Sequence, residues 1–171
     1  MLYDLLKKSV SFLFNLLNWL LCGKLPPFAS ACVIVEENQH YLVVELPGHH
    51  IVFPGGFLNH QETPQQAAER EGREETGLLL CVDDLINYYS LQNKNWHTMA
   101  NISFAFHASV IGGQLCNSIE GRPYWLSAAE LEPRLTGHAR EVYEDYLRYR
   151  TRHLPIKAEQ SKQKVPITTI S

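Results

Sequence analysis

The sequence predicts an α/β fold in which a mixed β-sheet lies between helices. Short apolar segments rich in β-branched and aromatic residues precede and follow one acidic helix, and an amphipathic helix comes after the last of them. That order is typical of a sheet covered by helices on both faces. The chain has 171 residues, of which 45% are hydrophobic, so it can bury the core of one domain.

The domain is expected over residues 28–152, between two segments of different composition. We expect strands at 31–35, 41–46, 78–82, 86–91, 102–110 and 124–126, with a hairpin turn at 36–39. Ser127 is expected to cap a brief helix, and a last helix should run from Thr136 or Gly137 to about Arg150. Residues 153–171 are polar and are predicted to be disordered.

The acidic helix has start and stop signals at both ends. Thr63 can cap its free N–H groups, Pro64 suits the first helical position, and Gln66 completes a capping box. Gly77 stands where a left-handed residue would end the helix. The sequence therefore predicts a helix from Pro64 to about Thr76.

Three carboxylates fall on one face of this helix. Glu71, Glu74 and Glu75 are spaced at i, i+3 and i+4, and Arg70 flanks them. A solvated surface face is one interpretation of this pattern. The preceding Phe-Pro-Gly-Gly-Phe segment favours another, because its glycines let the backbone approach the helix. Carboxylates with the carbonyl of Gly55 form a hard-oxygen site suited to Mg²⁺ or Mn²⁺.

The stretch from Gly56 to Leu78, GFLNHQETPQQAAEREGREETGL, fits the pattern GX5EX7REUXEEXGU with one departure. On this motif the chain resembles the Nudix hydrolase family. The departure is Gly72, which stands where the pattern has an aliphatic residue. A glycine inside a helix costs about 1 kcal/mol. It affects local rigidity rather than the ligand positions.

The resemblance implies a Nudix-type α/β/α sandwich and a set of site residues. Metal ligands are implied at Glu71, Glu74 and Glu75, joined by the carbonyl of Gly55 and supported by Glu62, with Arg70 orienting the acidic cluster. The implied cofactor is Mg²⁺, for which Mn²⁺ can substitute. The implied substrate is a nucleoside diphosphate linked to another moiety, X. ADP-ribose, a damaged nucleotide, a dinucleotide polyphosphate and a nucleotide sugar remain open for it.

The general base is expected outside the motif or within it. Glu120 lies in a glycine-containing loop before the Tyr-Trp-Leu strand and is one candidate; Glu71 and Glu75 are the others. The rival function is a non-catalytic domain that binds a nucleotide as a sensor or scaffold. The intact set of acidic motif residues favours catalysis.

Residues 1–27 form a separate apolar segment with one narrow polar stripe, which predicts an amphipathic helix. Three interpretations stay open. The helix packs on its own domain or on a second subunit in a homodimer; it lies on a membrane surface; or it is an export signal or membrane anchor. We therefore expect a cytoplasmic protein with membrane association through this helix as an alternative.

Charge and cysteine usage exclude some classes. The net charge of −3 provides no basic footprint for nucleic acid, so no nucleic-acid binding is expected. The four cysteines have no spacing typical of zinc and are expected to be buried free thiols in a reducing compartment.

Overall fold

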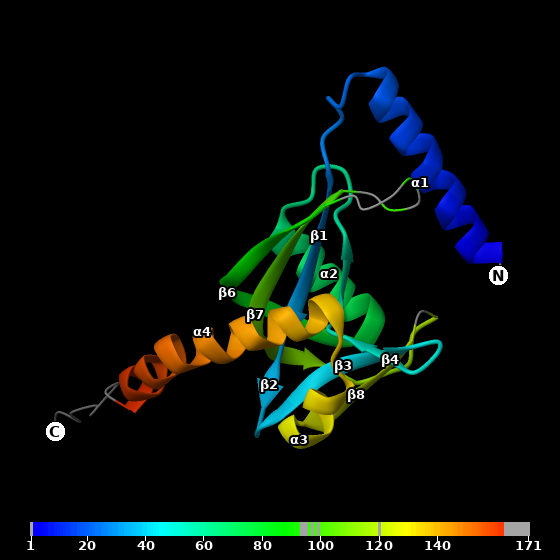
Figure 1. Ribbon diagram of the computed structural model, residues 1–171. Helices are drawn as coiled ribbons and strands as arrows, with labels where there is room; N and C mark the ends of the chain where they lie inside the picture. Colours follow the sequence, from blue (N-terminus) through cyan, green and yellow to red (C-terminus); the bar gives the residue numbers. More distant parts are fainter. Residues whose placement is uncertain (1, 93–95, 97, 99, 120, 163–171) are drawn as a thin grey trace, which may run out of the picture.

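The predicted mixed sheet is confirmed. The computed structural model describes residues 2–92, 96, 98, 100–119 and 121–162. Its first sheet has the order β5 (Gly55–Phe57), β1 (Phe28–Ile34), β7 (Asn101–Gly113) and β6 (Leu78–Leu91). Strands β1 and β7 are parallel, and the other pairs are antiparallel. Figure 1 shows this sheet with the acidic helix beside it.

A second sheet extends from the end of β1. It contains β2 (Glu36–Glu37), β3 (His40–Leu46) and β4 (His50–Val52), and β8 (Arg122–Ser127) pairs with β3. Residues Asn38 and Gln39 have positive φ and make the tight turn predicted between β2 and β3. The turn reverses the chain direction, so that β3 pairs with β2 on one edge and with β8 on the other.

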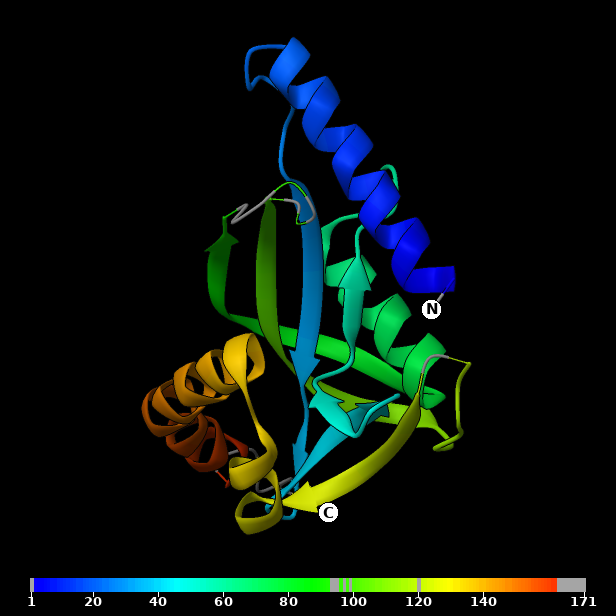
Figure 2. The ribbon, with the colours of Figure 1, turned by 45° about the vertical axis from the view of Figure 1, so that its right-hand side comes forward.

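Helices cover both sides of the strands (Figure 2). Helix α2 (Pro64–Thr76) shares a buried cluster with β1, β6 and β7, in which Ala67 and Ala68 pack with Val33 and Phe106. Helix α4 (Gly137–Lys162) and the short α3 (Ala128–Leu131), which the 3-10 turn η1 (Glu132–Arg134) follows, share another cluster with β1 and β3. The two clusters form the layers of the predicted α/β/α sandwich.

Two elements are longer than predicted. The sequence predicts two strands between residues 78 and 91, but β6 is continuous and bends at register shifts between Val82 and Asp84 and between Leu85 and Asn87. These irregularities interrupt the apolar alternation without ending the strand. Helix α4 continues to Lys162, past the predicted end near Arg150, so residues 153–162 are helical. Residues 163–171 of the expected tail lie outside the described residues.

The N-terminal segment folds as the predicted helix, α1 (Leu2–Leu20), at one end of the domain (Figures 1 and 2). Within the described residues, none of the helices combines the length and the apolar character needed to cross a membrane. The expectation of buried cysteines is wrong for three of them, and Cys32 is only partly buried. Cys22, Cys81 and Cys116 are exposed, because they lie after α1, on an outward position of β6 and in the loop after β7.

Candidate active site on helix α2

The ends of α2 are fixed as the sequence predicts. Thr63 Oγ1 accepts a hydrogen bond from Gln66 N at 3.2 Å, and Gln66 Oε1 accepts one from Thr63 N at 3.0 Å. Gly77 ends the helix with φ of 77°, and its N–H donates to Arg73 O. Because both ends are fixed, the rotation of the helix about its axis is fixed too. That rotation determines the direction in which its carboxylates point.

Arg70 is the centre of the acidic cluster. Its Nε donates to Glu62 Oε1 at 2.7 Å and its Nη2 to Glu62 Oε2 at 3.0 Å, a two-pronged ion pair. Its Nη1 donates to Glu71 Oε1 at 2.8 Å and to Glu74 Oε2 at 3.1 Å. Nη2 also donates to the carbonyl of Phe57 at 2.9 Å. One guanidinium therefore joins three motif glutamates to strand β5.

The charges of this cluster stabilise one another. Hydrogen bonds from Arg70, with a further one from the N–H of Asn59 at 2.9 Å, lower the pKa of Glu62 below its ordinary value. Hydrogen bonding to Glu62, helped by Glu71 and Glu74, raises the pKa of Arg70. Arg70 therefore stays cationic and Glu62 anionic at neutral pH, and the pair fixes the loop after β5 against α2.

Glu75 is held from a different side. It is only 4% exposed, and its Oε2 accepts a hydrogen bond from Gly55 N at 2.9 Å. The β5 backbone approaches β1 so closely at Gly55 that a Cβ there would lie 2.6 Å from Cys32 Cα.

Burial, with the charge of Glu75 as a second cause, raises the pKa of the Cys32 thiol to about 12. Cys32 is therefore a neutral thiol and adds no negative charge beside Glu75.

Gly56 brings the backbone against Glu71. A Cβ at this position would lie 2.5 Å from Glu71 Cδ and 2.8 Å from its Oε2, distances that real Cβ contacts do not reach. The absence of a side chain therefore lets the carboxylate lie directly over the strand. This is the close approach expected from the paired glycines.

Gly72, the departure from the motif, has a packing reason. It is buried, and a Cβ there would overlap Leu80 Cδ1 of β6 and approach Val33 Cγ2 of β1 at 3.7 Å. The Leu80 side chain thus occupies space that an aliphatic residue at position 72 would take. Because Leu80 fills this space from the neighbouring strand, the helix packs closely on the sheet without a side chain at position 72.

The donors of the cluster suit a hard divalent cation. Carboxylate oxygens from one helix face and backbone carbonyls of a glycine-containing strand are the ligands that Mg²⁺ and Mn²⁺ prefer. In the part of the chain that the structure describes, no three or more His, Cys, Asp or Glu side chains are grouped closely enough to hold a metal ion. Arg70 instead holds Glu71 and Glu74, and the Gly55 N–H holds Glu75.

Glu120, the candidate base outside the motif, lies outside the described residues. Its neighbour Gly121 is placed closely against β3, since a Cβ there would lie 2.7 Å from Glu45 O. Ser118 N donates to Gly121 O at 3.1 Å. The role of Glu120 therefore stays a prediction.

A cavity of about 610 Å³ adjoins the acidic cluster and was not predicted. Gly55 and Gly56, which contact the motif glutamates, also line it, together with residues of β1, β4 and β7 and the start of α4. Its volume is in the range of small-molecule sites. The sequence gives no signal for this cavity, because its lining residues are far apart in the chain and carry no motif.

Four of the polar side chains that line this cavity are hydrogen-bonded in pairs. Asn101 Nδ2 donates to Ser30 Oγ at 2.7 Å, and His138 Nε2 lies 3.1 Å from Ser103 Oγ. Among the described residues, Asn101 Oδ1 has no hydrogen-bond partner although it is buried. A buried acceptor without a partner is costly unless something donates to it. The lining of the cavity therefore combines hydrogen-bonded polar side chains with apolar ones.

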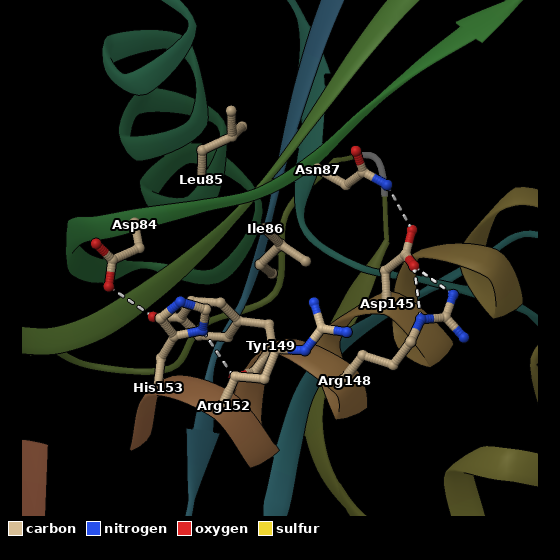
Figure 3. A pocket seen from close by; sticks show the side chains of 9 residues that line it. All are labelled: Asp84, Leu85, Ile86, Asn87, Asp145, Arg148, Tyr149, Arg152 and His153. Carbon is tan, nitrogen blue, oxygen red and sulfur yellow. Dashed lines mark hydrogen bonds and ion pairs between the residues drawn. The ribbon is translucent and has the colours of Figure 1, made fainter. Parts of the chain in front are cut away.

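A second hollow, of about 400 Å³, lies between β6 and α4 (Figure 3). Its side chains are largely engaged with one another. Asp145 accepts hydrogen bonds from Arg148 and from Asn87, the latter at 2.8 Å, and Tyr149 donates to Asp84 at 2.6 Å. None of its lining residues belongs to the motif, so we assign the chemistry to the cavity beside Gly55 and Gly56.

Comparisons with known proteins identify the family. The NUDIX domain model matches residues 25–146. An "ADP-ribose pyrophosphatase" of Methanocaldococcus jannaschii is 28% identical over 74% of this chain and 76% of its own length. A "MutT-like protein" of Streptomyces ambofaciens is 32% identical over 69% of this chain and 74% of its own.

A solved structure agrees in fold. A NUDIX hydrolase from Nitrosomonas europaea superposes with a TM-score of 0.66 at 24% identity, covering 72% of this chain and 90% of its own. The region that the NUDIX domain model matches contains both sheets, α2 and the first part of α4. The chain therefore belongs to the NUDIX family and is a Nudix hydrolase.

Proposed function

We propose that this Nudix hydrolase cleaves the pyrophosphate linkage of a nucleoside diphosphate derivative, with Mg²⁺ or Mn²⁺, and that a nucleoside diphosphate sugar of the ADP-ribose type is its substrate. The observation that carries the proposal is the contact of Gly55 and Gly56 with both the motif glutamates and the 610 Å³ cavity. The similarity to an "ADP-ribose pyrophosphatase" supports the choice of substrate.

Glu71, Glu74 and Glu75 would hold the metal, with the carbonyl of Gly55 as a backbone donor. A bound divalent cation neutralises the charge of a pyrophosphate and acidifies an attacking water. Arg70 positions Glu71 and Glu74, since one of its nitrogens contacts both. The Gly55 N–H positions Glu75 in the same way. Glu62 fixes Arg70, so that its removal would displace the ligands without removing one.

The water must also lose a proton. A carboxylate can accept it only if hydrogen bonds hold it in place beside the reacting phosphorus. Hydrogen bonds from Gly55 and Arg70 hold Glu75 and Glu71 in place, and Glu120 is the candidate from the loop before β8. Replacing each by glutamine tests the three separately, because glutamine keeps the shape and removes the basic oxygen.

The polar side chains of the cavity would recognise the part of the substrate beyond the phosphates. Asn101 lines this cavity and carries a carbonyl acceptor suited to a sugar hydroxyl or a base amino group. Its amide orientation is fixed by the bond from Nδ2 to Ser30 Oγ. An acceptor of this kind discriminates strongly against substrates that lack the donor. Asn101→Leu should therefore raise KM for the preferred substrate much more than for others.

The test is turnover of a panel of nucleoside diphosphate derivatives by the purified full chain, with Mg²⁺ and with Mn²⁺. ADP-ribose should give AMP and ribose 5-phosphate, identified by chromatography. A dinucleotide polyphosphate, an oxidised nucleoside triphosphate and a hexose-containing nucleotide sugar are the competing substrates. Preference for one of these would overturn the substrate class while leaving hydrolysis in place.

The rival function is a sensor that binds a nucleotide without cleaving it. The panel separates the two, because a sensor would show ligand-dependent thermal stabilisation and no product. The complete set of Glu62, Arg70, Glu71, Glu74 and Glu75 favours the enzyme. A Glu75→Gln variant run beside the wild type excludes a contaminating hydrolase as the source of product.

A further inference from the structure

Helix α1 is oriented with its polar stripe towards the domain and its apolar face outwards. Ser11 is 3% exposed and Asn15 is 7% exposed. Asn15 Nδ2 donates to the carbonyls of Trp96 and Thr98, at 3.0 Å each. Asn18 Oδ1 accepts a hydrogen bond from Leu25 N at 3.1 Å. An amphipathic helix that covers its own core would place these residues on the outer side.

The other side of the helix presents large apolar side chains to solvent. Leu13 and Leu20 are 66% and 62% exposed, and Trp19 is 67% exposed. The outward face also includes Val10, Phe12, Leu17 and Leu21, each about half exposed, and Trp96, whose ring lies 6.0 Å from that of Phe12. A contiguous exposed patch of this kind marks a surface that binds something apolar.

The charge around this face identifies the partner. Lys7, Lys8 and Lys24 against Asp4 give residues 1–27 a formal charge of +2, which leaves −5 on the rest of a chain whose total is −3. Residues 5–27 contain no Asp or Glu. Lys8 is exposed on the helix, and Lys24 follows the end of the helix. A basic apolar face on an acidic domain fits an anionic lipid surface.

We propose that α1 lies flat on an anionic membrane, with Leu13, Leu17 and Leu20 inserted among the acyl chains and Trp19 at the headgroup level. Tryptophan suits that depth because its ring is apolar and its N–H can bond to the interface. Lys8 and Lys24 can extend to the phosphates while their stems stay on the apolar surface. The domain is held against the membrane through the bonds that Asn15 makes to Trp96 and Thr98.

A second copy of the chain fits this face less well. Two helices that met through it would bring Lys8 and Lys24 of one copy near the lysines of the other, and like charges repel. Asn15 and Asn18, whose amides could pair across such an interface, bond within their own chain instead. On an anionic membrane, by contrast, the lipid phosphates pair with the lysines and the acyl chains bury the leucines.

The test is flotation of the full chain with vesicles of phosphatidylcholine alone and of phosphatidylcholine mixed with phosphatidylglycerol. Wild type should float with the mixed vesicles, and less with phosphatidylcholine alone or in high salt. The double variant Leu13→Ser, Leu20→Ser should bind at least about tenfold more weakly. Ile111→Ser, which removes a 69% exposed apolar side chain from β7, is the matched control and should float as wild type does.

Two further measurements keep the proposal testable. Circular dichroism melting shows that each variant is folded, and Lys8→Gln with Lys24→Gln should reduce the preference for the anionic vesicles. Failure of wild type to float, or equal flotation of the double leucine variant, would overturn the proposal. Analytical sedimentation without lipid measures the oligomeric state and so tests the alternative that a second copy covers this face. A dimer that the leucine variant abolishes, in a chain that does not float, would assign the face to a second copy instead.

Discussion

The carboxylate of Glu71 lies directly over the α-carbon of Gly56, so that a Cβ on that residue would stand 2.5 Å from Glu71 Cδ. The atom in the way is at the end of a side chain, which can move without disturbing the fold. A side chain at position 56 would therefore change the position of Glu71, a proposed metal ligand, more than it would change the stability of the fold.

Gly56→Ala should lower turnover at least about tenfold, since a shift of about 1 Å in a catalytic group can cost ~100-fold. Its melting temperature should change little. Gly112→Ala is the matched control, because a Cβ there would lie 3.5 Å from Leu79 Cδ1, an ordinary contact. Equal turnover of the two variants would show that the position of Glu71 over Gly56 does not matter for catalysis.

Glu62→Gln tests how much the ion pair between Glu62 and Arg70 stabilises the fold. Arg70 lowers the pKa of Glu62 below 4.5, so the ion pair stabilises the folded state fully above that pH and is lost as the pH falls through the lowered pKa. The wild type should therefore melt above the variant at pH 7, and the difference should shrink only in acid below about pH 4.5. A difference that is unchanged at low pH would contradict the assignment.

Because Gly72 packs against Leu80, substitutions at these two positions should have non-additive effects on the free energy of unfolding. Leu80→Ala alone should cost about 2–5 kcal/mol of unfolding free energy. Gly72→Ala should gain less than the ~1 kcal/mol of helix propensity, because the new methyl meets Leu80. In the double variant that conflict is gone, so a coupling of about 0.5–3 kcal/mol is expected in urea unfolding. Leu79→Ala, at a 45% exposed position, is the control and should show additivity with Gly72→Ala.

The cysteines should differ in reactivity. Burial and Glu75 raise the pKa of Cys32 to about 12, whereas Cys22, Cys81 and Cys116 are exposed. Because the thiolate is the reactive form, iodoacetamide at pH 8 should alkylate the three exposed cysteines and leave Cys32 unmodified. Peptide mass spectrometry measures this directly. Rapid labelling of Cys32 in the native protein would contradict the burial of its sulfur beside Glu75.

Local signals in the sequence account for the acidic helix. Thr63, Gln66 and Gly77 determine its ends through bonds within a few residues, and its phase then places Glu71, Glu74 and Glu75 on one face. The contact of Arg70 with Glu74 follows from the same periodicity, and the family motif adds the roles. Strands β1, β3, β7 and β8 were predicted from alternation, whereas β6 was predicted as two strands and the short strands β2, β4 and β5 were missed.

Long-range contacts could not be predicted in the same way. The cavity combines Ser30, Asn101 and His138, which are brought together only when β1, β7 and α4 assemble. The stripe on α1 was visible in the sequence, but its direction depends on Asn15 bonding to carbonyls more than 80 residues away. Gly72 looked like a weakness because the compensating Leu80 belongs to another element.

The measurement that tests the central claim most directly is the turnover of ADP-ribose as a function of Mg²⁺ concentration, for wild type and Glu75→Gln. Glu75 is buried and bonded to Gly55, so glutamine there removes one carboxylate charge from the proposed metal ligands while the fold is retained. We expect saturable, metal-dependent formation of AMP and ribose 5-phosphate by wild type and a loss of about 100-fold or more in the variant. Near-normal turnover of Glu75→Gln at saturating Mg²⁺, or product formation by wild type with the metal chelated, would contradict the account.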